Sequence, residues 1–179
     1  LLGSNFLDET EGYANYFDKV SFVDWYLINE ITKNNDACFF SSCYLNITPG
    51  GKLKMGPLWD YDIALGNVNY NDNQSYEGFW IKKKVTWFSR MIEDPSFVAL
   101  VKERFAYFKS KENDMLTNIN ENATYLKFSV IENNAKWNTL YEQTWPNYAV
   151  WGSYNNEVQY LKQWLSKRLA WLESAFSEL

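Results

Sequence analysis

Two aspartates stand close together in the segment Gly56–Asn67, which reads GPLWDYDIALGN. Asp60 and Asp62 alternate there with apolar and aromatic residues. If the segment is an extended strand, both carboxylates point to one face, because side chains alternate along a strand. Two carboxylates on one face repel each other unless a cation lies between them, and a divalent ion with oxygen ligands is the simplest candidate. The alternative is that the strand ends at Asp60 and both acids are solvated at a loop entrance.

A third acid, Asp36, favours the cation-binding interpretation of Asp60 and Asp62. The sequence LNITPGGKLKM, at 45–55, alternates polar and apolar residues around the turn Thr48–Gly51, which predicts a β-hairpin. Its second strand would run into Trp59 and Asp60. Asp36 precedes this hairpin and Asp60 follows it, so its antiparallel strands would bring the two acids to one end. In protein kinases, one aspartate orients the acceptor hydroxyl and a second, after a hairpin, holds the metal on the ATP phosphates.

Composition narrows the chemistry further. The chain has no histidine, which excludes histidine zinc sites and Ser-His-Asp triads and leaves carboxylates, lysines and hydroxyls. The net charge is −5, with 22 acidic residues spread along the chain, which argues against a nucleic-acid or anionic-membrane binder. No run reaches the roughly 20 apolar residues that span a bilayer. Cys38 and Cys43 are too few and too close for a disulfide framework, so we expect two small, partly buried thiols.

The remaining patterns predict mostly helices. Ser21, with Asp24 three positions later, predicts a helix start, and this helix should fail near Asn34–Asp36, because Asn and Asp favour turns. Asp94 before Pro95 predicts a second start. Further helices are predicted over 112–140 and 153–176, and an irregular loop over 66–78. The prediction is one domain, residues 1–179, of α+β class, predominantly α-helical with a small β-hairpin.

Four stretches carry a family resemblance: SFVDWYLINEITKNNDA, SSCYLNI, GKLKMGPLWDYDIALGN and EVQYLKQWLSKRLAWLESAF. Together they resemble the C-terminal part of the kinase domain in the CotH kinase family, the spore coat protein H-like atypical protein kinases. The sharpest element is tryptophan-Asp-aromatic-Asp followed by small residues and Gly-Asn. The fold expected from the resemblance is the C-terminal lobe of an atypical protein kinase.

The resemblance implies a role for each acid. Asp36 would be the catalytic-loop aspartate, Asp60 the metal-binding aspartate, and Asp62 an assisting metal contact. The cofactors implied are Mg²⁺ or Mn²⁺ and ATP. The asparagine that ligates metal after the catalytic aspartate of typical kinases is absent, so Ser42 is the candidate ligand there. Lys54 could reach a phosphate, or it is an outward-facing strand residue.

The resemblance also implies partners and context. We expect a phosphotransferase acting on Ser or Thr of a protein substrate, and a monomer. Because neither a nucleotide-cradling glycine loop nor its lysine pair is recognised, we expect an N-terminal nucleotide lobe outside these residues and little activity without it. Family resemblance suggests an exported or cell-surface bacterial protein whose signal segment is not in this chain.

Two other functions fit parts of the sequence. Aromatic residues make up 19 % of the chain, and Trp137, Trp145 and Trp151 in the Tyr/Asn-rich 133–156 region could stack on sugars, as in a non-enzymatic surface or carbohydrate-binding module. We expect most of these aromatic side chains to be core instead. A glycoside hydrolase using Asp36 and Asp60 is the third possibility.

Overall fold

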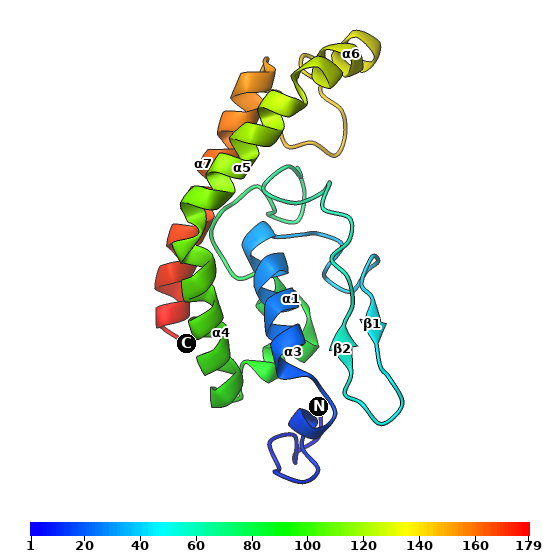
Figure 1. The fold of residues 1–179 in the computed structure, drawn as a ribbon, viewed down its shortest axis with the longest axis vertical. Coiled ribbons are helices and arrows are strands. Elements are labelled where there is room, and N and C mark those ends of the chain that lie inside the picture. The colour runs from blue at the N-terminus through cyan, green and yellow to red at the C-terminus, as the bar shows by residue number, and fades with distance from the viewer.

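Seven α-helices and one short hairpin organise residues 1–179, all of which the computed structural model describes (Figure 1). Helix α1 stands in the middle of the main body, between the hairpin and the helices α4 and α7 (Figure 1). The prediction of a mainly helical α+β chain is confirmed. In chain order the elements are η1 (Tyr13–Asn15), α1 (Lys19–Thr32), β1 (Leu45–Asn46), β2 (Lys54–Met55), α2 (Ile81–Lys84), α3 (Thr86–Met91), α4 (Pro95–Ser110), α5 (Glu112–Tyr125), α6 (Lys127–Trp137) and α7 (Tyr154–Ser177).

The ends of α1 are set by local side chains and backbone. Asp18 is the N-cap, and its carboxylate accepts from Ser21 N at 3.0 Å. The predicted start at Ser21 is therefore wrong, because the capping carboxylate comes one turn earlier. At the other end Lys33 has φ 47°, a left-handed conformation that stops the helix. The predicted failure before Asn34–Asp36 is confirmed.

The core surrounds α1 on three sides. Phe88 of α3 stacks on Trp25 and Tyr26 of α1, each with ring centroids 5.4 Å apart. Helices α4 and α7 complete the core, and α4 begins at Pro95 behind an Asp94 cap, as predicted. The fully buried apolar side chains include Phe22, Val23, Tyr26 and Leu27 of α1, Phe97 and Val101 of α4, and Leu169 and Leu172 of α7.

Helices α5 and α6 form an arm that leaves the main body. Figure 1 shows α5 beside α7, with α6 at the far end. Neither α5 nor α6 has a buried residue, and the helical region predicted over 112–140 is two helices that divide at Leu126. The expectation that most aromatics of the 133–156 region are core is wrong, because Trp137, Trp145 and Trp151 are 61 %, 74 % and 38 % exposed.

The predicted hairpin is confirmed, but its strands are short. Leu45 pairs with Met55 and Asn46 with Lys54 in antiparallel register. β2 ends at Met55, so the expectation that the second strand runs into Asp60 is wrong. The segment 66–78 contains no helix or strand, as predicted.

Candidate functional site

Two segments that are distant in sequence meet at the C-terminal end of α1. One is the turn that carries Asp36, and the other is the segment after the hairpin that carries Asp60. Three hydrogen bonds join these segments: Asn34 Nδ2 to Asp60 O at 3.1 Å, Asn35 N to Ile63 O at 3.2 Å, and Leu65 N to Thr32 O at 2.7 Å. The hairpin does return the chain to its starting point, as the sequence predicts.

Asn34 is the side chain that links the two acidic segments directly. Its Nδ2 donates to Asp60 O, and its Oδ1 accepts from Asp36 N at 3.2 Å. The residue is 1 % exposed, so both ends of its amide are used inside the protein. A buried amide with both ends bonded holds the two backbones in one arrangement. Asp36 itself is partly exposed.

Asp60 has a backbone conformation that the strand prediction did not anticipate. Its φ is 64°, in the left-handed region, so the alternation that would place Asp60 and Asp62 on one face of a strand is absent. Ser42, with φ 54°, and Phe39, with φ 61°, share this region of φ. Such conformations cost about 1–2 kcal/mol for residues with a Cβ, and they concentrate at functional sites.

The donors around Asp60 fit a magnesium ion bound together with phosphates. Asp60 is exposed, and Ser42 Oγ donates to its Oδ2 at 3.1 Å. Asp62 is exposed two residues later. The structure has no group of three or more acidic, thiol or imidazole side chains that could hold a metal by themselves. Mg²⁺ commonly binds through one or two carboxylates and completes its coordination with water and substrate phosphates. The oxygen donors of Asp60, Asp62 and Ser42 are of the type that Mg²⁺ and Mn²⁺ prefer.

Lys54 lies elsewhere. Its Nζ is 3.6 Å from Asp18 Oδ2, at the N-terminal end of α1. The 14 residues of α1 span about 21 Å, and Asp36 follows the opposite end. The structure therefore brings Asp36, Asp60 and Ser42 to one region and leaves Lys54 outside it.

A buried lysine, Lys33, connects the end of α1 to the loop 72–80. Lys33 is 1 % exposed, and its ammonium donates to Glu77 O at 2.6 Å and to Asp72 O at 3.3 Å. Burial lowers the pKa of Lys33 to about 8. The indole of Trp80 donates to Asn34 O at 2.8 Å. The loop 72–80 is thus tied to the backbone that precedes Asp36.

A buried ion pair fixes the same loop to α7. Glu30 and Arg168 are both fully buried, and Arg168 Nη2 lies 2.8 Å from Glu30 Oε1. The guanidinium also donates to the carbonyls of Tyr76 and Gly78 at 2.9 and 2.8 Å. Glu30 Oε2 accepts from Lys82 N at 3.0 Å. Each charge therefore has several hydrogen-bond partners, as a buried pair requires.

The segment after Asp60 is anchored at both ends. Tyr61 OH donates to Asn29 Oδ1 at 2.9 Å, and burial raises the pKa of Tyr61 to about 12. Gly66 has φ 80°, and a Cβ on it would lie 2.4 Å from Trp164 Nε1. Glycine is therefore required there both by conformation and by the close approach of α7.

Both thiols follow Asp36 in the chain and are free. Cys38 is buried and Cys43 partly buried, as expected. Cys43 Sγ donates to Asp36 O at 3.7 Å. Burial raises the pKa of Cys38 to about 11, so this thiol stays protonated at neutral pH. Their role here is packing around the turn.

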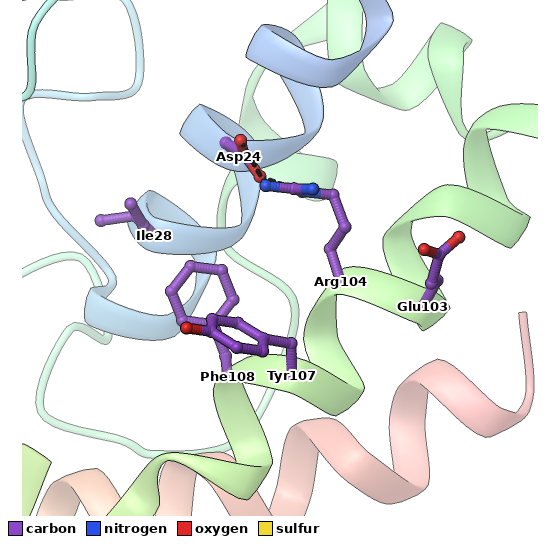
Figure 2. A pocket seen from close by; sticks show the side chains of 6 residues that line it. All are labelled: Asp24, Ile28, Glu103, Arg104, Tyr107 and Phe108. Carbon is purple, nitrogen blue, oxygen red and sulfur yellow. Dashed lines mark hydrogen bonds and ion pairs between the residues drawn. The ribbon is translucent and has the colours of Figure 1, made fainter. Parts of the chain in front are cut away.

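A larger cleft lies away from the acids, between α1 and α4 (Figure 2). It has a volume of about 540 Å³, and Ile28, Tyr107 and Phe108 form its apolar part. Figure 2 shows the guanidinium of Arg104 facing the carboxylate of Asp24, and Nη2 lies 2.7 Å from Oδ2. The two charges neutralise each other, and none of the predicted site residues lines this cleft. A smaller hollow of about 230 Å³ includes Ser42 in its lining.

Comparison with known families identifies the chain. The family model described as CotH kinase protein matches residues 4–172. The chain belongs to the CotH kinase family. Comparisons with curated proteins and with solved structures found no match. At the family level this CotH chain is kinase-like, and kinases in general use ATP with a divalent metal. None of its helices has both the length and the apolarity needed to cross a membrane.

Sequence reasoning missed the residues that hold the acids of this CotH chain in place. Asn34, Lys33, Glu30 and Arg168 were not singled out. A charged residue on the apolar face of a predicted helix was a usable signal for Glu30, because buried charges are rare unless paired. Nothing local in the sequence pointed to Arg168, which lies 138 residues further along the chain.

Proposed function

We propose that this chain is the catalytic and metal-binding lobe of a CotH-type protein kinase that transfers the γ-phosphoryl group of ATP to Ser or Thr hydroxyls of a protein. The observation that carries the proposal is the Asn34 amide, which joins the Asp36 turn to the Asp60 segment. A kinase needs an acceptor-orienting carboxylate and a metal-binding carboxylate in one fixed arrangement.

Asp36 is assigned to the acceptor. Its carboxylate would orient the Ser or Thr hydroxyl and take its proton as the hydroxyl oxygen bonds to the γ-phosphorus. The bond between that phosphorus and the bridging oxygen breaks, and ADP leaves with the electron pair. The proton then passes from Asp36 to solvent.

Asp60 is assigned to the metal, with Ser42 and Asp62 as further oxygen donors. When bound, Mg²⁺ or Mn²⁺ would neutralise the charge on the β- and γ-phosphates. The left-handed backbone of Asp60 and the hydrogen bond from Ser42 Oγ at 3.1 Å aim one carboxylate oxygen and leave the other open. The site is exposed, so phosphates can approach it from solvent.

The nucleotide-cradling parts are assigned to a lobe outside residues 1–179, acting in cis. Support comes from uncovered apolar side chains beside the site. Phe40, Leu58 and Trp59 are 74 %, 45 % and 57 % exposed and come from the two segments that meet there. Large exposed apolar side chains on the segments that carry a site favour a contact surface there. We also propose that the protein is exported or lies at the cell surface, which fractionation of the producing cells would test.

The test uses the full-length protein and phosphoryl transfer from labelled ATP to a protein acceptor. Asp36→Asn should lower the rate by about 100-fold or more, since removing a catalytic proton acceptor costs that much. Asp60→Asn should also lower the rate strongly, because the metal on the phosphates loses its carboxylate ligand. Asp72→Asn is the matched control, because Asp72 is also exposed and has φ 62°. Wild-type rates in either site variant, with thermal melting unchanged, would sink the assignment.

A second candidate function is favoured by one observation. Trp137, Trp145 and Trp151 are exposed and could stack on sugar rings in a carbohydrate-binding module. Binding to a glycan array that Asp60→Asn leaves intact, without any effect of metal or nucleotide, would favour this function over the kinase.

A further inference from the structure

Trp145 presents a large aromatic face to solvent from the loop that joins α6 to α7. Its side chain is 74 % exposed, the same fraction as Phe40. The ring stacks on Tyr70, with centroids 6.0 Å apart and planes at 16°. Tryptophan is usually well covered in folded proteins, so an ordered and exposed indole needs an explanation.

The loop that carries Trp145 is fixed to the loop that follows the Asp60 segment. Asn69 N donates to Pro146 O at 3.0 Å, next to the indole. A second bond joins the same loops, because Asn67 Nδ2 donates to Asn147 Oδ1 at 3.1 Å. Both bonds come just before Tyr70 in one loop and just after Trp145 in the other. The aromatic pair is therefore held in place by the residues around it.

The same pair is connected to the Asp36 turn. Asn35 Nδ2 donates to Tyr70 OH at 3.3 Å, and Asn71 Nδ2 donates to Asn35 Oδ1 at 3.3 Å. Asn35 is 6 % exposed and directly precedes Asp36. The contacts thus run from the indole through Tyr70 to the residue beside the proposed acceptor aspartate.

We propose that the Tyr70–Trp145 pair is a docking platform for the acceptor polypeptide. It would take one apolar or aromatic side chain of the acceptor at a set number of residues from the phosphorylated Ser or Thr. The assignment rests on the proposed kinase function.

The shape of the aromatic pair and its fixed spacing from Asp36 suit such an acceptor. Neither ring has a lysine or arginine stacked on it, and an indole face is itself a large apolar surface, so it suits an apolar group. An extended peptide advances about 3.3 Å per residue, so a platform fixed relative to Asp36 selects one register. Trp and Tyr are also the residue types that dominate binding energy at interfaces.

The experiment uses the full-length protein and short peptides with a central Ser, in which a single Trp or Leu is moved along an otherwise polar sequence. Wild-type protein should prefer one position. Trp145→Ala should remove this preference and raise KM for the preferred peptide by about tenfold or more, with KM for ATP unchanged. Trp145→Phe should restore most of the preference. Phe128→Ala is the control, since Phe128 is 69 % exposed but lies on α6.

Peptide binding is also measured directly, by fluorescence anisotropy with the Asp36→Asn protein, so that the platform is tested without turnover. Weaker binding with Trp145→Ala on this background supports the platform. Equal binding, or no preferred position, overturns it. If Asp36→Asn phosphorylates as fast as wild type, the kinase assignment of Asp36 fails while the anisotropy still decides the platform. Trp145→Ala could instead lose binding to a soluble β-glucan and keep its affinity for the peptide. That result would assign the ring to glycans and overturn the proposal.

Discussion

Removal of Arg168 should destabilise the protein and loosen the loop beneath the site. The guanidinium is fully buried, pairs with Glu30 at 2.8 Å and donates to the carbonyls of Tyr76 and Gly78. Arg168→Met keeps much of the side-chain length and removes every one of these donors. Glu30 then remains buried, with backbone N–H groups such as that of Lys82 as its remaining donors.

The expected loss follows from that uncompensated charge. Removal of one partner from a buried ion pair costs about 3–5 kcal/mol. In a chain of this length each kcal/mol shifts Tm by about 2–4 °C, so Tm should fall by about 6–20 °C. Adding Glu30→Gln removes the stranded charge, so the double variant should be more stable than Arg168→Met alone.

The assay is urea unfolding at pH 7 followed by tryptophan fluorescence, with hydrogen exchange of residues 72–80 measured beside it. Arg104→Met is the matched control, because Arg104 pairs with Asp24 but both side chains are about one-third exposed, at 38 % and 34 %. Ion pairs with this much solvent exposure contribute about 0–1 kcal/mol. Equal losses for the two arginine variants, or a double variant less stable than Arg168→Met, would refute the reasoning.

Two further predictions concern Gly66 and Asp94. Gly66→Ala should lower the free energy of unfolding by at least about 2 kcal/mol, because the new Cβ combines a φ of 80° with a clash against Trp164. Gly78→Ala, with φ 79° and open space, should lower it by about 1–2 kcal/mol. Urea unfolding of both variants tests this difference, and equal costs would contradict it. Burial alone would raise the pKa of the Asp94 carboxyl, but donors including Lys19 and Tyr13 outweigh it and hold that pKa below its ordinary value of 3.8. The ionised carboxylate therefore stabilises the fold above about pH 4 and loses this effect as pH falls. Asp94→Asn should be less stable than wild type at pH 7, with a gap that narrows below pH 4, and a gap independent of pH would argue against this account.

Local patterns were enough to predict much of the fold. The Asp94–Pro95 pair starts α4 because a capping carboxylate and a fixed proline φ both act within one turn. The Pro-Gly-Gly turn sets the hairpin for the same reason, and the hairpin returns the chain so that the Asp36 and Asp60 segments meet. Predictions failed where the outcome depends on distant groups. The strand ends at Met55, and Asp60 has a left-handed backbone with hydrogen bonds from Asn34 and Ser42, a pairing that no local pattern encodes.

The exposed indoles are a second case in which contacts distant in sequence decide the outcome. Trp145 resembles a core residue by type, yet the partner that orients it is Tyr70, far along the chain. Hydrophobicity sets an average tendency toward burial, and which aromatic residues stay outside depends on the path of the loop between α6 and α7.

The central claim is that Asp36 and Asp60 act as one site. The most direct measurement is phosphoryl transfer by the full-length protein in four forms: wild type, Asp36→Asn, Asp60→Asn and the double variant. Residues that act as a unit give non-additive losses, so the double variant should be no slower than the slower single variant. Losses that multiply in the double variant, or single variants as fast as wild type, would contradict the claim.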